Sequence, residues 1–169
     1  RLFGNGLIIP VGPLREPVSR LKSVDLIIQN GGKVIVPSLT KMNENHMLMT
    51  IEPQGLIHIC SQEIVTLNNL KDKSVNAVCG IGNPERFFST LKPFCNELTQ
   101  YVFSDHHDFV LDDFSSLNQN IVIMTEKDAV KCRSFARENW YYLKVSATLS
   151  TKDSNQLIAT LKQNLLNEE

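Results

Sequence analysis

The sequence predicts an α/β fold, a largely parallel sheet flanked by helices in a Rossmann-like three-layer arrangement that also contains a β-hairpin. From Ser74 onward, short apolar runs alternate with amphipathic stretches. The runs at 75–80, 98–103 and 121–125 each precede such a stretch, which predicts strand, helix, strand, helix. That alternation is typical of right-handed crossover connections between parallel strands.

The N-terminal part is predicted to be a shaped loop followed by one strand. Residues 1–23 hold three of the eight glycines and three of the seven prolines, so they cannot form one continuous helix. Their one short apolar piece is 7–9. Residues 24–29 read as a strand, because the turn-forming Asn-Gly-Gly sequence follows them directly. Residues 33–45 are expected to be a linker.

The predicted hairpin lies between two apolar runs, 46–51 and 56–60. The sequence EPQG joins them, and its Pro53 and Gly55 are typical of a tight turn. Near the other end of the chain we expect a strand at 141–145 and a closing amphipathic helix at 154–166.

Composition excludes several classes of protein. The formal charge of −1 argues against nucleic acid as a partner, because nucleic-acid binders carry a concentrated basic surface. No run approaches the roughly 20 apolar residues that a membrane-spanning helix needs. The chain opens on an arginine without a leader-like segment, so we expect a piece of a longer protein. The four cysteines lie far apart and mostly in apolar runs, which predicts buried, reduced thiols in a cytosolic protein; they are Cys60, Cys79, Cys95 and Cys132.

Three unusual peptides follow predicted strands, at 79–88, 104–109 and 125–131. Ligands of open parallel sheets bind outside the carboxyl ends of the strands, so we expect all three peptides at one edge. In the first peptide, two glycines permit a sharp turn, Asn83 is a suitable N-cap and Pro84 suits the first helical position. That helix start is either a well-made turn or an anion site.

The peptide TEKDAVK at 125–131 predicts a capped helix. Thr125 can cap the helix while Asp128 returns a bond three residues later. Lys127 is then either a solvated surface lysine or a cation that neutralises a phosphate at the sheet edge.

The peptide SDHHDF at 104–109 is the candidate catalytic segment. A carboxylate beside a histidine can orient its ring and make it more basic, as a general base requires. His106 directly follows Asp105 and is therefore the favoured histidine, although polar loops after strands are also ordinary. His46 and His58 lie in strand-like runs and are expected to be structural.

Six peptides together resemble the C-terminal portion of one family, the tetraacyldisaccharide 4'-kinases (lipid A 4'-kinases). They occur in the family's order and cover nearly the whole chain, at 4–17, 20–32, 77–91, 103–109, 124–136 and 140–145. The resemblance implies transfer of the γ-phosphate of ATP, with Mg²⁺, to the 4'-hydroxyl of a tetraacyldisaccharide 1-phosphate. It further implies a monomer at the cytoplasmic face of the Gram-negative inner membrane, where the full-length protein would meet the membrane surface.

The resemblance also implies roles for particular residues. His106 matches the family's active-site histidine, with Asp105 orienting it. Glu16 resembles the acidic residue near the magnesium ion, and Asn5 and Arg15 are expected to line the nucleotide or disaccharide cleft. Lys127 is added as a candidate substrate- or nucleotide-binding residue because of its expected place at the sheet edge, and not through the resemblance.

One departure from the family pattern limits the expected activity. The family's glycine-rich phosphate loop would lie upstream of position 1, since no GxxxxGK[ST] occurs in this chain. Residues 1–44 are then a remnant of the P-loop NTPase-like nucleotide-binding domain and a linker, 45–150 a C-terminal α/β domain, and 151–169 a closing helix. The chain by itself is expected to be inactive.

Two other readings remain open. A DHH-type phosphoesterase also carries an Asp-His-His tripeptide after a strand and binds manganese there, but it needs a further histidine motif, and no histidine follows His107. A non-catalytic binding module would use the edge motifs only as helix caps and as a partner surface.

Overall fold

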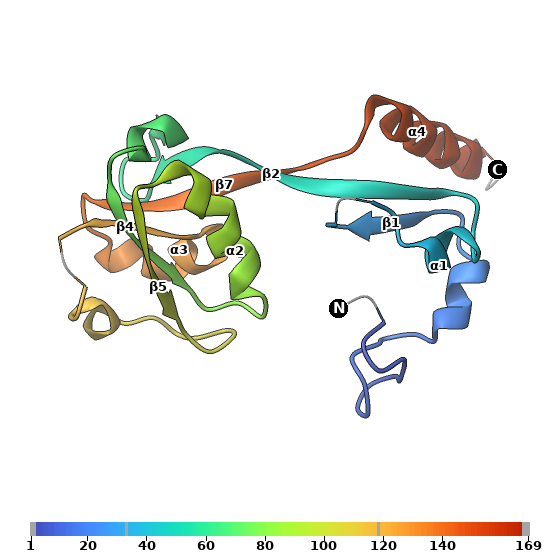
Figure 1. The fold of residues 1–169 in the computed structure, drawn as a ribbon, viewed down its shortest axis with the longest axis horizontal. Helices are drawn as coiled ribbons and strands as arrows, with labels where there is room; N and C mark the ends of the chain where they lie inside the picture. Colours follow the sequence, from blue (N-terminus) through green and yellow to red (C-terminus); the bar gives the residue numbers. More distant parts are fainter. Residues whose placement is uncertain (1–2, 33, 118, 167–169) are drawn as a thin grey trace. The chain divides into compact units, whose positions relative to one another are not determined.

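The structure is a computed structural model that describes residues 3–32, 34–117 and 119–166 (Figure 1). It comprises two compact units, the first formed by residues 1–51 with 147–169 and the second by residues 52–146. Strands β2 (His46–His58) and β7 (Trp140–Thr148) contribute residues to both.

In the first unit, strand β1 (Ile27–Asn30) pairs in parallel with the start of β2. The strand predicted at 24–29 is therefore present, displaced toward the glycines. Buried Gln29 shapes the turn that follows, since its amide donates to the carbonyls of Gly31 and Val34 and accepts the N–H of Val36. The predicted linker contains a short helix, α1 (Pro37–Thr40), which begins at a proline because that residue suits the first turn. A 3₁₀ turn spans Val18–Lys22.

The closing helix α4 (Thr151–Leu166) begins three residues before the predicted start. The hydroxyl of Ser150 accepts the N–H of Asp153, which gives the first turn a cap that the apolar pattern does not reveal. Gln156 donates to the side chain of Asn45, and the helix groups with the N-terminal residues as part of the first unit.

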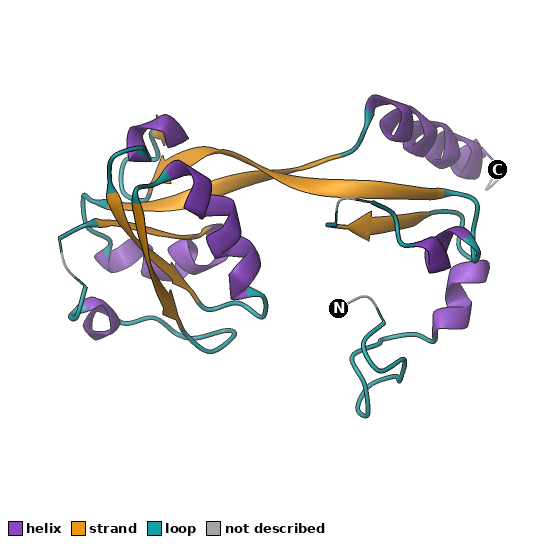
Figure 2. Cartoon of the chain, viewed as in Figure 1, coloured by secondary structure: helices purple, strands orange, loops and turns teal. Residues whose placement is uncertain are grey.

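In the second unit the strand order is β2-β7-β6-β4-β5, with β3 paired to β2. Figure 2 shows the strands in orange and the helices in purple. The pairs β4–β5, β4–β6 and β6–β7 are all parallel, so the predicted largely parallel sheet is confirmed. The strands not yet bounded are β3 (Ile64–Val65), β4 (Ser74–Cys79), β5 (Glu97–Val102) and β6 (Ile121–Thr125).

Helices cover both faces of this sheet, as the three-layer prediction requires. Because side chains alternate along a strand, Val75 and Ala77 of β4 face one layer and Val78 faces the other. Helix α2 (Pro84–Leu91) packs on the first face, and α3 (Glu126–Cys132) packs on the second. Short 3₁₀ turns complete the unit, at Leu67–Leu70, Lys92–Phe94, Leu111–Phe114 and Arg133–Phe135.

The predicted hairpin turn at EPQG is wrong, because β2 continues through it as one strand of 13 residues. The pairing with β1 ends at Met49 and that with β3 begins at Leu56, so Pro53 lies between the segments of β2 that pair with these two strands. Gly55 has a φ of 158°, close to fully extended backbone. The hairpin lies further on, where β2 and β3 pair in antiparallel fashion.

Two further expectations are corrected. The amphipathic segment after β5 forms only the 3₁₀ turn Leu111–Phe114, and α3 ends at Cys132, sooner than its pattern predicts. All four cysteines are free, and Cys79 and Cys132 are buried, but Cys60 is exposed, since it follows the last residue of β2 in a turn.

Candidate functional site

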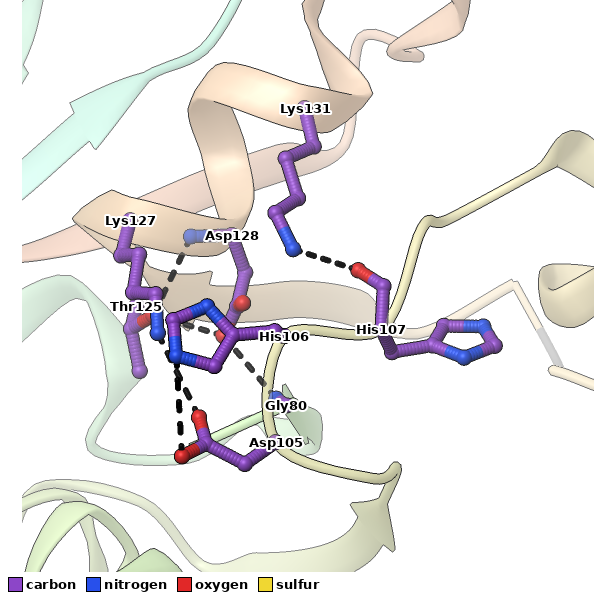
Figure 3. A network of polar contacts seen from close by, with 8 residues as sticks. All are labelled: Gly80, Asp105, His106, His107, Thr125, Lys127, Asp128 and Lys131. Atoms are coloured by element: carbon purple, nitrogen blue, oxygen red, sulfur yellow. Dashed lines mark hydrogen bonds and ion pairs between the residues drawn. The ribbon is translucent and has the colours of Figure 1, made fainter. Parts of the chain in front are cut away.

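The three edge peptides meet in the second unit, as the sequence predicts. Cys79, at the end of β4, pairs with Val102, at the end of β5, and the adjacent Val78 pairs with Met124 of β6. The loops that follow these strands therefore leave the sheet side by side. Figure 3 shows Gly80, Asp105 and Thr125 from the three peptides within one network of polar contacts.

Asp105 lies between two basic side chains. Its Oδ1 is 3.3 Å from Nζ of Lys127, and its Oδ2 is 3.9 Å from Nε2 of His106 (Figure 3). Desolvation acts to raise the pKa of Asp105, but the hydrogen bond and charge of Lys127, together with His106, lower it below the usual range. Asp105 is thus an ionised carboxylate held beside an imidazole.

His106 is presented to solvent by an unusual backbone conformation. Its φ is 65°, in the left-handed region that non-glycine residues rarely adopt, and its side chain is 76% exposed. Its N–H donates to the carbonyl of Gly80 at 3.3 Å, which fixes the loop against the end of β4. Strained residues of this kind cluster at active sites and ligand-binding loops.

The side chain of His107, unlike that of His106, is held by several contacts. Its Nε2 is 2.9 Å from Oδ2 of Asp113, and its ring packs against Phe103 and Phe109 with centroid distances of 4.8 and 4.9 Å. The ammonium of Lys131 donates to its backbone carbonyl. These contacts indicate that His107 stabilises the loop, and that His106 is the histidine available to a ligand.

Asp113 is also bound by its own turn. It accepts the N–H of Val110 at 2.9 Å in addition to its contact with His107. The Val110 N–H and then the His107 hydrogen bond lower the pKa of the Asp113 carboxyl, against a smaller opposing effect of desolvation.

Asp128 is a buried member of the network whose connections sequence reasoning missed. The predicted cap is present, since the Thr125 hydroxyl accepts the N–H of Asp128. The Asp128 side chain is fully buried, however, and its Oδ2 also accepts the N–H of Gly80, far away in the sequence. The spacing of Asp128 and apolar Cys132, four residues apart, is the signal that places this carboxylate on the buried side of α3. By contrast, the predicted N-cap Asn83 makes no capping bond, although Pro84 does begin α2.

The remaining predicted site residues belong to the first unit. The Asn5 side chain braces its own loop, donating to the Val11 carbonyl and accepting the Leu7 N–H, both at 3.1 Å. Glu16 is 64% exposed and pairs with Arg20 at 3.2 Å. Arg15 is exposed.

Neither a metal cluster nor a membrane span is found in the part of the chain that the structure describes. No group of three or more His, Cys, Asp or Glu side chains among those residues could hold a metal ion. None of their helices combines the length and the apolar character needed to cross a bilayer.

Comparison with known proteins identifies the family. The family model described as tetraacyldisaccharide-1-P 4'-kinase matches residues 1–165. The chain belongs to this family. The 4'-kinase of Colwellia psychrerythraea is 46% identical over 162 residues, which are 94% of this chain and 47% of that protein. The 4'-kinase of Methylobacillus flagellatus is 43% identical over 162 residues, 95% of this chain and 46% of the relative.

The chain thus spans about half the length of the curated 4'-kinases that it matches. A solved structure, the "apo" form of LpxK from Aquifex aeolicus in complex with ATP, matches 94% of this chain and 48% of its own, with a TM-score of 0.63 and 21% sequence identity. At that identity the likeness concerns the fold. The phosphoesterase reading finds no support, since the relatives are 4'-kinases.

Proposed function

We propose that this chain is the C-terminal part of an enzyme that transfers the γ-phosphate of ATP to the 4'-hydroxyl of a tetraacyldisaccharide 1-phosphate. Family membership supports the reaction, and the ATP complex of the Aquifex aeolicus relative supports the phosphate donor. The observation that carries the proposal is the exposed His106, held beside the ionised Asp105 at the carboxyl edge of a parallel sheet.

His106 is proposed to act on the attacking hydroxyl group. Phosphoryl transfer depends mainly on positioning and on charge stabilisation, and a base near the hydroxyl receives its proton as the new bond to phosphorus forms. The Asp105 carboxylate, 3.9 Å from Nε2 of His106, is proposed to hold the ring in position beside that hydroxyl. Lys127 is proposed to meet a phosphate group, because its ammonium is half-exposed even while paired with Asp105.

The first unit is proposed to contribute to the nucleotide site. Asn5 and Arg15 would line the nucleotide or disaccharide cleft, and Glu16 would supply one carboxylate to Mg²⁺. Glu16 fits that role, because Mg²⁺ usually binds one or two carboxylates together with substrate phosphates and water. Its exposed pair with Arg20 costs about 1 kcal/mol or less to exchange. When bound, the ion would neutralise phosphate charge.

The proposal extends to the whole protein. Residues 1–44 would end the nucleotide-binding domain, 45–150 would form the second α/β domain, and 151–169 would close the chain. The upstream half present in the relatives would carry the glycine-rich phosphate loop, so this chain alone should not turn over substrate. The full-length enzyme would work as a monomer at the cytoplasmic face of the Gram-negative inner membrane.

The test is His106→Ala in the full-length kinase that contains this chain, measured as phosphate transfer from ATP to tetraacyldisaccharide 1-phosphate. We expect kcat to fall by about 10²-fold or more, the usual contribution of a positioned acid–base group. His46→Ala is the matched control, since its ring forms a hydrogen bond with the nearby Asn43 carbonyl at the start of β2, and it should keep near-normal turnover. Near-normal turnover of His106→Ala would remove this histidine from the reaction and leave a binding role for the loop.

A further inference from the structure

The buried carboxylate of Asp128 joins two of the three edge peptides directly, through Gly80 and Thr125, and it lies too deep to meet a substrate. We infer that Asp128 is the positioning residue of His106: it fixes the Gly80 turn and the start of α3, and through them the exposed imidazole. This inference rests on the proposed role of His106 in phosphate transfer.

One oxygen atom of Asp128 accepts two hydrogen bonds. Oδ2 of Asp128 accepts the N–H of Gly80 at 3.0 Å and the hydroxyl proton of Thr125 at 2.6 Å. The Thr125 oxygen in turn accepts the N–H of Asp128 at 3.2 Å, so its proton is free to point at the carboxylate. One carboxylate oxygen therefore joins the end of β4 to the end of β6.

The backbone of Gly80 links Asp128 to His106 through two hydrogen bonds. Gly80 donates its N–H to Asp128, and its carbonyl accepts the N–H of His106 at 3.3 Å. Space around this glycine is tight, because a Cβ built on it would lie 3.1 Å from the carbonyl oxygen of Ser104. A displacement of Gly80 is thus passed directly to the loop that holds His106 in its left-handed conformation.

Helix α3 links Asp128 to Asp105 through Lys127. Lys127 precedes Asp128 in the first turn of α3, and its ammonium reaches Asp105 from there (Figure 3). The cap that holds Asp128 in place therefore also fixes the backbone position of Lys127. Asp128 therefore determines both the backbone position of His106 and the placement of the carboxylate beside it.

The burial of Asp128 is not explained by its role as a local helix cap alone. Asp128 is fully buried, and its Oδ1 has no hydrogen-bond partner among the described residues. A solvent-exposed Ser, Thr or Asp cap would satisfy the helix end without the desolvation of a carboxylate. The long-range bond to Gly80 is the contact that an exposed cap could not make.

The experiment compares Asp128→Ala with Asp128→Asn in the full-length kinase. Asp128→Ala should lower kcat at least tenfold with little change in KM, and should increase amide hydrogen exchange at Gly80 and His106 at least tenfold. Asp128→Asn keeps an oxygen that can accept both donors, and should recover most of the loss in kcat. Val122→Ala, a buried change on β6, the strand that precedes α3, is the matched control for stability and should leave kcat and the His106 amide unchanged.

Normal kcat and unchanged exchange at His106 in Asp128→Ala would overturn the inference. If that variant does not fold, Thr125→Val against Thr125→Ser decides in the same way, since only the serine retains the hydroxyl that bonds Asp128. A kinase in which His106→Ala stays active would refute the proposed role of His106 in the reaction, whereas the exchange measurement would still report whether Asp128 holds the loop.

Discussion

The carboxylate of Asp105 lies 3.3 Å from the ammonium group of Lys127, although the two residues are 22 positions apart in the chain. The pair joins the loop after β5 to the first turn of α3. Both side chains are about half exposed, so salt weakens their attraction and contact with an anionic ligand can redirect the lysine. The pair is accordingly better suited to tuning a site than to stabilising the fold.

Asp105→Asn and Lys127→Ala should therefore affect activity without being additive. In the full-length kinase we expect Asp105→Asn to lower kcat about tenfold, because the imidazole loses its carboxylate partner. Lys127→Ala should raise the KM for the phosphate-bearing substrate. The double variant should be less impaired than the two single effects predict, since the residues are in contact. Steady-state kinetics on the four proteins gives the coupling, and strictly additive effects would show that the two residues act independently of each other.

Gly80 and Gly82 offer a matched pair of substitutions. Alanine at Gly80 would place its Cβ 3.1 Å from the Ser104 carbonyl oxygen and 3.4 Å from Phe109, so it should destabilise the fold by about 1–3 kcal/mol. Alanine at exposed Gly82 meets only Asp105, at an ordinary 3.5 Å, and should change stability by about 0.5 kcal/mol or less. Urea unfolding of both variants measures the difference, and equal stabilities would mean that the approach of the two loops is unimportant.

The parallel sheet was predictable because its signals are local. Each apolar run such as 121–125 is bounded by turn or cap residues, and the carboxyl ends of parallel strands necessarily share an edge. The course of β2 through Pro53 was not predictable, since it depends on where β1 and β3 pair. The candidate site likewise has a part that was predictable from the sequence and a part that was not. Proximity of His106 to Asp105 follows from adjacency, whereas the bond from Asp128 to Gly80 spans 48 positions and exists only in the folded chain.

The contact between Asp113 and His107 predicts a loss of stability in acid. The pKa of Asp113 is lower in the folded protein than the ordinary value of 3.8, so its contribution to stability is present above that value and is lost as pH falls through the folded pKa. The difference in unfolding free energy between the wild type and Asp113→Asn should be constant above about pH 5 and shrink below it. Urea unfolding at several pH values measures it. A difference that grows in acid would show the opposite sign of coupling.

The four thiols should differ sharply in reactivity. Burial first, and then the charge of Asp128, raise the pKa of Cys79 to about 11 and that of Cys132 to about 12, so neither forms a thiolate at neutral pH. Cys60 is exposed and should be alkylated first by iodoacetamide in the native protein, with Cys95 slower. Mass spectrometry after timed labelling identifies the sites. Rapid labelling of Cys79 without denaturant would mean that the loop above β4 opens readily.

The left-handed backbone of His106 predicts that function and stability oppose each other at this position. A residue with a Cβ costs about 1–2 kcal/mol in that conformation, and glycine adopts it freely at an entropic cost of about 0.5–1 kcal/mol. His106→Gly should therefore be more stable than His106→Ala by about 0.5–1 kcal/mol. Both variants should show the same large fall in phosphate transfer, because both lack the imidazole.

Asp108 is the control for that comparison, being exposed in the same loop without a positive φ. There the order should reverse, with Asp108→Ala more stable than Asp108→Gly, since glycine only loses entropy on folding. Thermal or urea unfolding of the four variants gives both differences. If glycine is the less stable residue at both positions, the loop relaxes its strain at little cost, and the exposed placement of His106 would not depend on a strained backbone.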